Sequence, residues 1–226
     1  MSTTILRTTD AWWVSTPAGA ARIATDATTT SGLLAERERI EAAGVSSTTV
    51  DPATLRLVSP VTAPCRVVAQ MTNFVSHVKD SGLDPDTVPM TFFRKTSGSL
   101  SGPFDDIICP GHVRFLDYEV EIGLVIGQEL PVGAQVTEDT WTSLVAGLVV
   151  TNDVSARDVQ LPKTQFFEAK SYPTFTPVGP ALVLLHEDEL KRFGDLRLRL
   201  WVNGELRQDS VVDGEWSTHR CRPCKG

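Results

Sequence analysis

The chain has 226 residues, of which 41% are hydrophobic and 22% are charged, and its formal net charge is −7 at pH 7. This composition is typical of a globular protein large enough to bury a substantial core. The acidic balance argues against nucleic-acid binding, which needs clustered Lys and Arg, and no apolar run approaches the about 20 residues that cross a bilayer. Residues 1–10 are polar and show no secretory signal, so we expect a cytoplasmic protein.

Residues 1–52 are predicted to form a small N-terminal region of strands and one helix. Aromatic and β-branched residues flank Pro17-Ala18-Gly19, which predicts two short strands within residues 12–25 around a turn. A helix is predicted over residues 31–43, with Ser31 as its N-cap and Gly44 at its end. The charged run within this helix is expected to face solvent.

Residues 53–213 are predicted to form a second, strand-rich domain. Short apolar runs separated by prolines begin there, after a linker at residues 46–52. Near the end of the domain, apolar and polar residues alternate up to Val202, and Asn203-Gly204 then supplies a two-residue hairpin turn. The predicted fold class is α+β, mostly β with a few helices.

The segment at residues 115–127 is predicted to be a strand with two carboxylates on one face. Period-two alternation places Glu119 and Glu121 together and turns Val120 and Ile122 to the opposite face. Neighbouring like charges disfavour each other unless a cation lies between them, and oxygen ligands suit magnesium, manganese or calcium better than zinc. The alternative is a solvent-exposed strand face, on which the glutamates only keep the surface polar.

A second group of polar residues follows the apolar run at residues 147–150. Asp153 lies in a turn that can start a helix and is a candidate third oxygen ligand, with helix capping as its alternative role. Arg157 and Gln160 are three residues apart, so on a helical turn they share a face and can hold a carboxylate and a carbonyl of one small substrate. A surface salt bridge is the alternative role of Arg157.

Four further side chains are candidates for chemistry. His77 and Asp80 lie three apart in a predicted helix, where a carboxylate beside an imidazole raises its basicity, as a water-activating base requires. A simple surface pair is the alternative. Lys95 and Lys170 follow apolar or aromatic residues, which can limit water access and sharpen their attraction for anions. Otherwise each lysine is a surface cation with a partly buried stem.

Five segments, in their order along the chain, resemble the fumarylacetoacetate hydrolase family. They are Asn-Phe-x-x-His at 73–77, Phe-Phe-x-Lys at 92–95, Tyr-Glu-Val-Glu-Ile at 118–122, Asn-Asp-Val-Ser-Ala-Arg-Asp-x-Gln at 152–160 and Lys-Ser-x-x-x-Phe-x-Pro at 170–177. The resemblance covers roughly residues 61–208. The segment at 152–160 is the most specific of the five, because several unusual residue choices coincide within one turn.

The resemblance implies a mixed β-sandwich or β-roll core, a homodimer and a site for Mg²⁺ or Mn²⁺. The implied metal ligands are Glu119, Glu121 and Asp153. His77 would be the general base, oriented by Asp80, which stands where family members often have glutamate. The implied substrate-binding residues are Lys95, Arg157, Gln160 and Lys170, with Ala169 replacing a glycine that is common before the lysine.

The same resemblance implies hydrolysis of a carbon–carbon bond in a 2,4-dioxo acid, an acylpyruvate or fumarylpyruvate from aromatic catabolism. The substrate would bind the metal as its enolate while His77 activates water to attack the distal carbonyl. One alternative is isomerisation or decarboxylation of a 2-hydroxy-dienoate or 2-oxo acid at the same site. Another is an inactive, truncated family member. The expected partner is a small carboxylate, with neither a nucleic acid nor a membrane.

The C-terminal residues depart from the family pattern. Family members continue after the hairpin with more strands and a Gly-Thr-Pro loop that helps to close the site, whereas residues 214–226 form a basic tail with no strand or helix period. We interpret this tail as atypical, with a frameshift that truncates the catalytic domain as its expected origin. Such a loss would leave sheet edges unpaired.

Overall fold

The computed structural model describes residues 2–71, 82, 84, 87, 91–163 and 166–212. His77, Asp80 and the predicted tail at 214–226 lie outside the described residues. The strands are β1 (Thr3–Arg7), β2 (Trp12–Thr16), β3 (Gly19–Arg22), β4 (Val67–Met71), β5 (Thr91–Lys95), β6 (Leu100–Ser101), β7 (Leu116–Asp117), β8 (Val120–Ile126), β9 (Val145–Asn152), β10 (Ser155–Ala156), β11 (Thr176–Leu184), β12 (Arg197–Val202) and β13 (Glu205–Val211).

The helices are short and lie between the strands. They are α1 (Thr30–Leu34), α2 (Arg37–Gly44), α4 (Trp141–Leu144), α5 (Arg157–Lys163), α6 (Phe166–Lys170) and α7 (Glu187–Leu190), together with the 3-10 turns η1 (Pro52–Thr54), η2 (Ser97–Ser99) and η3 (Phe193–Asp195). The predicted class, mostly β with a few helices, is confirmed. Across the described ranges, no helix has the length and apolar character needed to cross a membrane.

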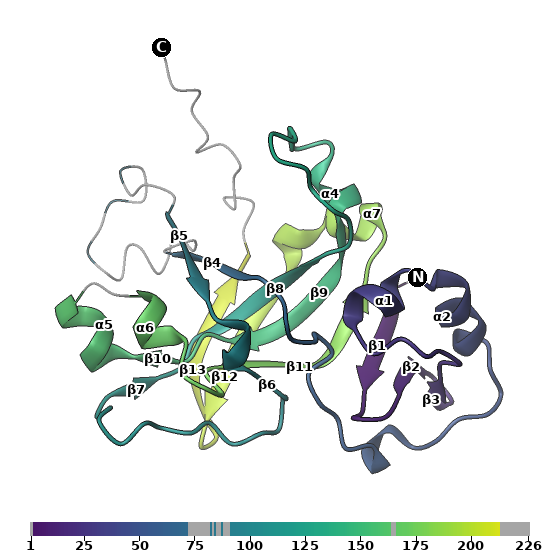
Figure 1. The fold of residues 1–226 in the computed structure, drawn as a ribbon, viewed down its shortest axis with the longest axis horizontal. Helices are drawn as coiled ribbons and strands as arrows, with labels where there is room; N and C mark the ends of the chain where they lie inside the picture. The colour runs from purple at the N-terminus through teal and green to yellow at the C-terminus, as the bar shows by residue number, and fades with distance from the viewer. Residues whose placement is uncertain are drawn as a thin grey trace.

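One large sheet organises the molecule, with strand order β3-β2-β1-β11-β9-β8 and β6 added in parallel beside β11 (Figure 1). Three separate two-stranded ladders accompany it: β4 with β5, β7 with β10, and β12 with β13. Because β1 pairs with β11, the N-terminal strands belong to the same sheet as strands from the second half of the chain. The division of the chain at residue 52 stays a prediction.

The N-terminal region confirms one predicted feature and corrects another. Strands β2 and β3 flank the turn at residues 17–18, as predicted. The single helix predicted over residues 31–43 is wrong, because the chain leaves the helical conformation at Glu36, whose ψ is 49°. Thr29, not Ser31, caps α1, and its hydroxyl accepts a hydrogen bond from the Gly32 amide at 3.1 Å. The break lets α2 pack against β2 and β3, so tertiary packing overrides the local pattern.

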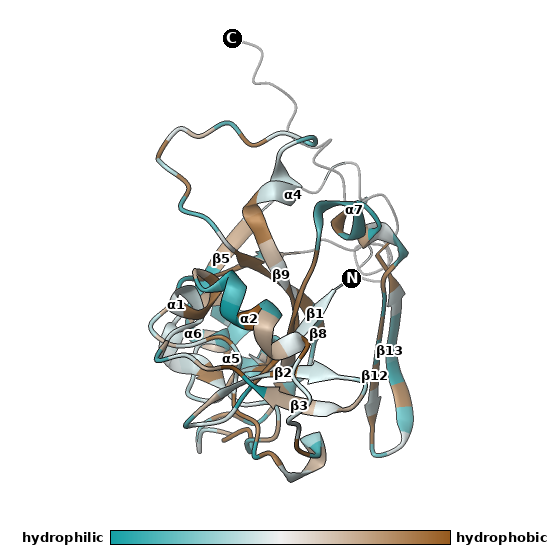
Figure 2. Ribbon diagram, turned by 90° about the vertical axis from the view of Figure 1, so that its right-hand side faces the viewer, coloured by the Kyte–Doolittle hydropathy of each residue, from teal (hydrophilic) through white to brown (hydrophobic). Residues whose placement is uncertain are grey.

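Two core clusters cover opposite faces of the central strands. The first joins Ile5 and Trp12 of the N-terminal strands with Leu33 and Ile40 of the two helices and Leu182 of β11. The other gathers Phe193, Leu198 and Val212, with Val120, Ile122 and Leu124 of β8 packed against them. In Figure 2 the central strand β9 is coloured mainly hydrophobic, whereas the surface helix α7 is coloured mainly hydrophilic.

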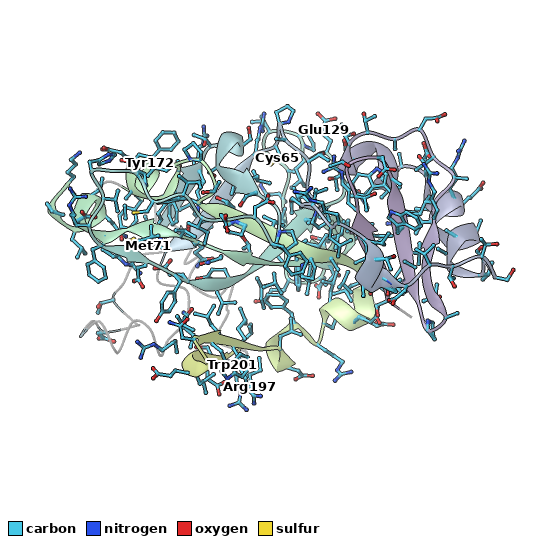
Figure 3. The ribbon with its side chains drawn as sticks, turned by 90° about the horizontal axis from the view of Figure 1, so that it is seen from below. Cys65, Met71, Glu129, Tyr172, Arg197 and Trp201 are labelled. Carbon is cyan, nitrogen blue, oxygen red and sulfur yellow. The ribbon has the colours of Figure 1, made fainter. Side chains whose placement is uncertain are left out.

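The predicted hairpin at the end of the described chain is confirmed. Strands β12 and β13 pair on either side of Asn203 and Gly204, which have φ of 52° and 83°. Both values lie in the left-handed region that a two-residue hairpin turn requires. Figure 3 shows Arg197 and Trp201 on this hairpin, on the opposite side of the central strands from Tyr172. Figure 1 shows α5, α6, β7 and β10 together at the end of the molecule away from the N-terminal strands.

Candidate functional site

The first two acidic candidates lie where β8 begins, with Glu119 directly before the strand and Glu121 as its second residue. Val120 and Ile122 pack into the core beside β12, so strand alternation directs Glu119 and Glu121 to the other face. The Glu119 backbone is fixed to the end of β9, since its amide donates to the Asn152 side chain at 3.0 Å and its carbonyl accepts from the Asp153 amide at 2.8 Å. Both glutamates are half-buried, which does not fit a solvent-exposed strand face.

Asp153 lies between two lysine side chains. Its Oδ1 accepts a hydrogen bond from Lys95 Nζ at 2.5 Å, and its Oδ2 accepts one from Lys170 Nζ at 2.7 Å. Burial opposes ionisation of Asp153, but the charges of the two ammonium groups outweigh it and hold its pKa below the ordinary value. The carboxylate therefore takes part in an ion-pair network, and both of its oxygens are engaged there rather than in helix capping.

Lys95 and Lys170 are buried cations, with 5% and 2% of their surfaces exposed. Lys95 ends β5, on which residues 92 and 94 are exposed while 93 and 95 point inward, and its Nζ also donates to the Phe175 carbonyl at 2.8 Å. Burial lowers the pKa of Lys95 despite its pairing with Asp153. Lys170 ends α6, and its Nζ lies 5.3 Å from the centre of the Phe93 ring. Neither lysine is a surface cation.

Arg157 connects the helix α5 to the acidic strand. Its Nη1 donates to Gln160 Oε1 at 2.7 Å, so the two side chains share a face as predicted. Its Nη2 donates to Glu119 Oε1, and Lys170 Nζ donates to the other Glu119 oxygen at 2.7 Å. Burial disfavours the charge on Arg157, yet the neighbouring carboxylates raise its pKa above the ordinary value. The guanidinium is thus part of the same network and not an isolated surface salt bridge.

Asp117 is a member of the site that the sequence interpretation missed. Its Oδ2 accepts a hydrogen bond from Arg157 Nε at 2.7 Å. The signal that could have found it is the strand alternation itself, because Asp117 precedes Glu119 and Glu121 at spacings of two residues. A third acidic residue therefore faces the same side of the chain.

Glu121 differs from its neighbours in having no described cation bonded to it. Within the residues that the structure describes, no ion pair or hydrogen bond to its carboxylate is present. Burial, together with the negative charges of Glu119 and Asp153, raises its pKa from 4.5 to about 8. A carboxyl group in this state is stabilised as an anion by an added cation, so the donor chemistry fits a hard divalent ion.

The acidic side chains of the site are not already grouped around one metal position. Over the described ranges, no three His, Cys, Asp or Glu side chains are grouped closely enough to hold a metal ion. Glu119 and Asp153 are instead satisfied by lysine and arginine. Of the nine predicted site residues, the structure brings together seven. Hydrogen bonds and ion pairs link six of them, which are Lys95, Glu119, Asp153, Arg157, Gln160 and Lys170, and Glu121 lies close enough to feel the charges of Glu119, Asp153 and Lys170.

Curated relatives match about two thirds of the chain. A 2,4-didehydro-3-deoxy-L-rhamnonate hydrolase from Sphingomonas sp. (strain SKA58) is 41% identical over 150 residues, which cover 66% of this chain and 50% of the relative. The human mitochondrial oxaloacetate tautomerase FAHD2A is 36% identical over 152 residues, which cover 66% of this chain and 46% of the relative. The match thus spans about half the length of these relatives.

Solved structures extend the similarity to most of the fold. A probable 2-hydroxyhepta-2,4-diene-1,7-dioate isomerase from Mycobacterium abscessus superposes with a TM-score of 0.75 at 31% identity, covering 93% of this chain and 73% of that one. A fumarylacetoacetate hydrolase from Exiguobacterium antarcticum gives a TM-score of 0.72 at 26% identity, with coverages of 95% and 79%. The family description "Fumarylacetoacetate (FAA) hydrolase C-terminal" matches residues 66–218, which include every residue of the cluster. The chain therefore belongs to the fumarylacetoacetate hydrolase family.

Proposed function

We propose that this chain is a divalent-metal-dependent hydrolase that cleaves a carbon–carbon bond of a 2,4-dioxo acid, with acylpyruvates or fumarylpyruvate of aromatic catabolism as the substrate class. The observation that carries the proposal is the cluster in which Lys170 and Arg157 hold opposite oxygens of Glu119 while Glu121 lacks a described cation. Such a site combines cationic groups for an anionic substrate with carboxylates for a metal. We assign the catalytic region to residues 53–213.

The residues that would hold Mg²⁺ or Mn²⁺ are Glu119, Glu121 and Asp153. All three donors are carboxylate oxygens, which these ions prefer. When bound, such an ion acts as a Lewis acid that stabilises negative charge on a substrate oxygen. Burial and like-charge repulsion raise the pKa of Glu121, and the same ion would relieve the repulsion.

The remaining side chains of the cluster would bind and orient the substrate. Arg157 and Gln160 are proposed to hold its carboxylate and a carbonyl, because guanidinium and amide donors lie on one face of α5. The Lys170 ammonium would stabilise charge that develops on the leaving enolate. Lys95, whose Nζ contacts Asp153 and the Phe175 carbonyl, would fix the Asp153 carboxylate in place.

The water-activating base is proposed from the family motif to be His77, oriented by Asp80. In the reaction, the water oxygen bonds to the distal carbonyl carbon and its proton passes to His77. The bond between carbons three and four then breaks, and its electron pair moves into the enolate of pyruvate, which takes up a proton. The products are pyruvate and a carboxylic acid, so water is the only co-reactant.

A second candidate function is isomerisation, including enol–keto tautomerisation, of a 2-oxo acid at the same site. The observation that favours it is the 36% identity with a protein named oxaloacetate tautomerase. This reaction needs the same enolate stabilisation by Lys170 and Arg157 but requires only proton transfer, without addition of water. Decarboxylation of a 2-oxo acid that carries a second carboxylate on carbon three, as oxaloacetate does, would release CO₂ and leave the electron pair in the same enolate, and it is a third outcome of the assay.

Hydrolysis is tested by measuring the release of pyruvate from a panel of acylpyruvates with and without Mg²⁺. Tautomerisation is tested in parallel by following the loss of the enol absorbance of oxaloacetate. We expect metal-dependent release of pyruvate that Glu119→Ala abolishes and that Glu129→Ala, an exposed glutamate, leaves unchanged. Loss of the enol absorbance without pyruvate release would replace hydrolysis with tautomerisation. Inactivity of soluble, magnesium-binding protein towards every substrate would identify an inactive family member.

We also propose that the protein is a homodimer of the cytoplasm. The dimer is an expectation from the family, and light scattering coupled to size exclusion would measure it, with a mass near the 24.6 kDa of one chain counting against it. Fractionation of cells that express the full chain would test the compartment. A mitochondrial location, as in the names of several relatives, is the opposing outcome.

A further inference from the structure

We propose that Asp117 is a positioning residue, which orients the Arg157 guanidinium so that its two terminal nitrogens face the substrate carboxylate. The inference rests on the proposed function for the identity of that carboxylate. The contacts that carry it join Arg157, a proposed substrate-binding residue, to Asp117, which is neither a proposed metal ligand nor a proposed substrate-binding residue. They connect the short strand β7 to the first residue of α5.

The backbones of Asp117 and Arg157 are held together by a small ladder. Ser155 lies opposite Asp117 and Ala156 opposite Leu116 in the pairing of β10 with β7. The Arg157 amide then donates to the Phe115 carbonyl at 2.9 Å. Two segments 40 residues apart in the sequence are therefore held side by side by backbone pairing as well as by their side-chain contact.

The Asp117 carboxylate is itself held in one orientation. Its Oδ1 accepts a hydrogen bond from the Tyr118 amide at 2.9 Å, and its Oδ2 accepts one from Arg157 Nε at 2.7 Å. A carboxylate bound at both oxygens has little freedom to turn. It can therefore serve as a fixed reference for the guanidinium, whose long side chain would otherwise lose more conformational entropy on binding a substrate.

The contact at Nε decides where the other end of the guanidinium points. With Nε directed to Asp117, Nη1 faces Gln160 and Nη2 faces Glu119. Within the described residues, these bonds use three of the five guanidinium N–H groups and leave one on each terminal nitrogen. Two parallel N–H groups match the two oxygens of a carboxylate. Lysine has no equivalent of Nε and could not be oriented in this way.

The ion pair is placed to act on a substrate. The side chains of Arg157 and Asp117 are 18% and 29% exposed, so the pair lies at the wall of the site and not in the core. By contrast, the Arg197 and Asp209 pair is similar in chemistry but lies on the β12–β13 hairpin, which packs against the Val120 and Ile122 face of β8. Asp209→Asn is therefore a matched control, since it alters an arginine–aspartate pair outside the site.

Asp117→Asn is the informative variant. If the asparagine oxygen keeps its bond to the Tyr118 amide, its NH₂ group faces Arg157 Nε–H, donor against donor. The local backbone bond is retained while the orienting contact is lost. Asp117→Glu keeps the acceptor on a longer side chain and serves as the conservative rescue.

The first measurement is the kinetics of acylpyruvate hydrolysis in Mg²⁺. We expect Asp117→Asn to raise KM about tenfold, as loss of a charge-assisted contact predicts, with kcat and the magnesium affinity unchanged within about twofold. Asp117→Glu should recover part of KM, and Asp209→Asn should match the wild type. An unchanged KM in Asp117→Asn, or an equal loss of magnesium affinity, would overturn the inference.

The second measurement requires no turnover. In protein labelled with ¹⁵N-arginine, the Arg157 Nε–H should exchange slowly with solvent in the wild type and about tenfold faster in Asp117→Asn. Fast exchange in the wild type, or no change in the variant, counts against positioning. If the wild type hydrolyses no acylpyruvate but shows this difference, the orientation of Arg157 by Asp117 is supported and the proposed function has failed by itself.

Discussion

The site and the β12–β13 hairpin both contain pairs of basic and acidic side chains, but in opposite surroundings. In the site, Lys170 and Lys95 are almost fully buried and share the carboxylate of Asp153. On the hairpin, Arg197 pairs with Asp209 at 2.5 Å while half of the arginine side chain is exposed. A short distance alone does not make an ion pair important for stability. Water screens the exposed pair, whereas the buried charges depend on each other for stabilisation.

The largest expected effect comes from breaking the buried network at its centre. Asp153→Ala would leave two buried ammonium groups without their shared carboxylate, which destabilises a protein by about 3–5 kcal/mol. Urea unfolding, followed by tryptophan fluorescence, measures this loss in the free energy of unfolding. Wild-type stability in Asp153→Ala would show that the lysines find other partners or lose their protons.

Replacing Arg157 by lysine tests whether charge or shape matters in the network. Lysine keeps the positive charge but cannot contact Asp117, Gln160 and Glu119 with a planar fork. We expect Arg157→Lys to lower kcat/KM by about tenfold to a hundredfold, measured on an acylpyruvate. Activity equal to the wild type would mean that a point charge is sufficient at this position.

The stability of the site, unlike that of the hairpin, is expected to depend on pH through Glu121. Its folded-state pKa of about 8 exceeds the ordinary value of 4.5, so the folded protein binds a proton more tightly than the unfolded chain. The stability of metal-free protein should therefore fall as pH rises from about 4.5 to 8. Thermal unfolding across this range checks the trend, which Glu121→Gln should flatten.

Added magnesium should oppose the loss of stability that accompanies rising pH. An ion that binds the folded site stabilises it by mass action, and it does so more strongly where Glu121 is ionised. We expect added Mg²⁺ to raise the unfolding temperature more at pH 8 than at pH 6, and EDTA to reverse the gain. An equal shift at both values would indicate that Glu121 is not a ligand.

The smallest effect is expected on the hairpin. Asp209→Ala removes the partner of Arg197 and the weaker partner of Arg199, yet both arginines remain hydrated. Neither the free energy of unfolding nor kcat/KM should change beyond measurement error. A clear loss of stability there would remove the contrast between exposed and buried pairs.

Much of the fold could be predicted because its signals are local. Alternation marked β8 and β12, and Asn203-Gly204 marked the turn, since left-handed φ values there favour these residues. The helix at residues 31–43 failed for the opposite reason, because its break at Glu36 depends on packing of α2 against β2 and β3. Strand β1 was not predicted, and its place beside β11 joins residues far apart in the sequence.

The sequence by itself determined which residues of the cluster carry charge and that Glu119 and Glu121 share a strand face. Only the tertiary structure decided which charges meet. Lys95 and Asp153 are 58 residues apart in the sequence, and Lys170 and Glu119 are 51 apart. Asp117 gained its partner in the same way, through the pairing of β7 with β10. The physical reason is that periodicity orients a side chain within its own element, whereas ion pairs form only after sheet pairing and burial bring distant elements together.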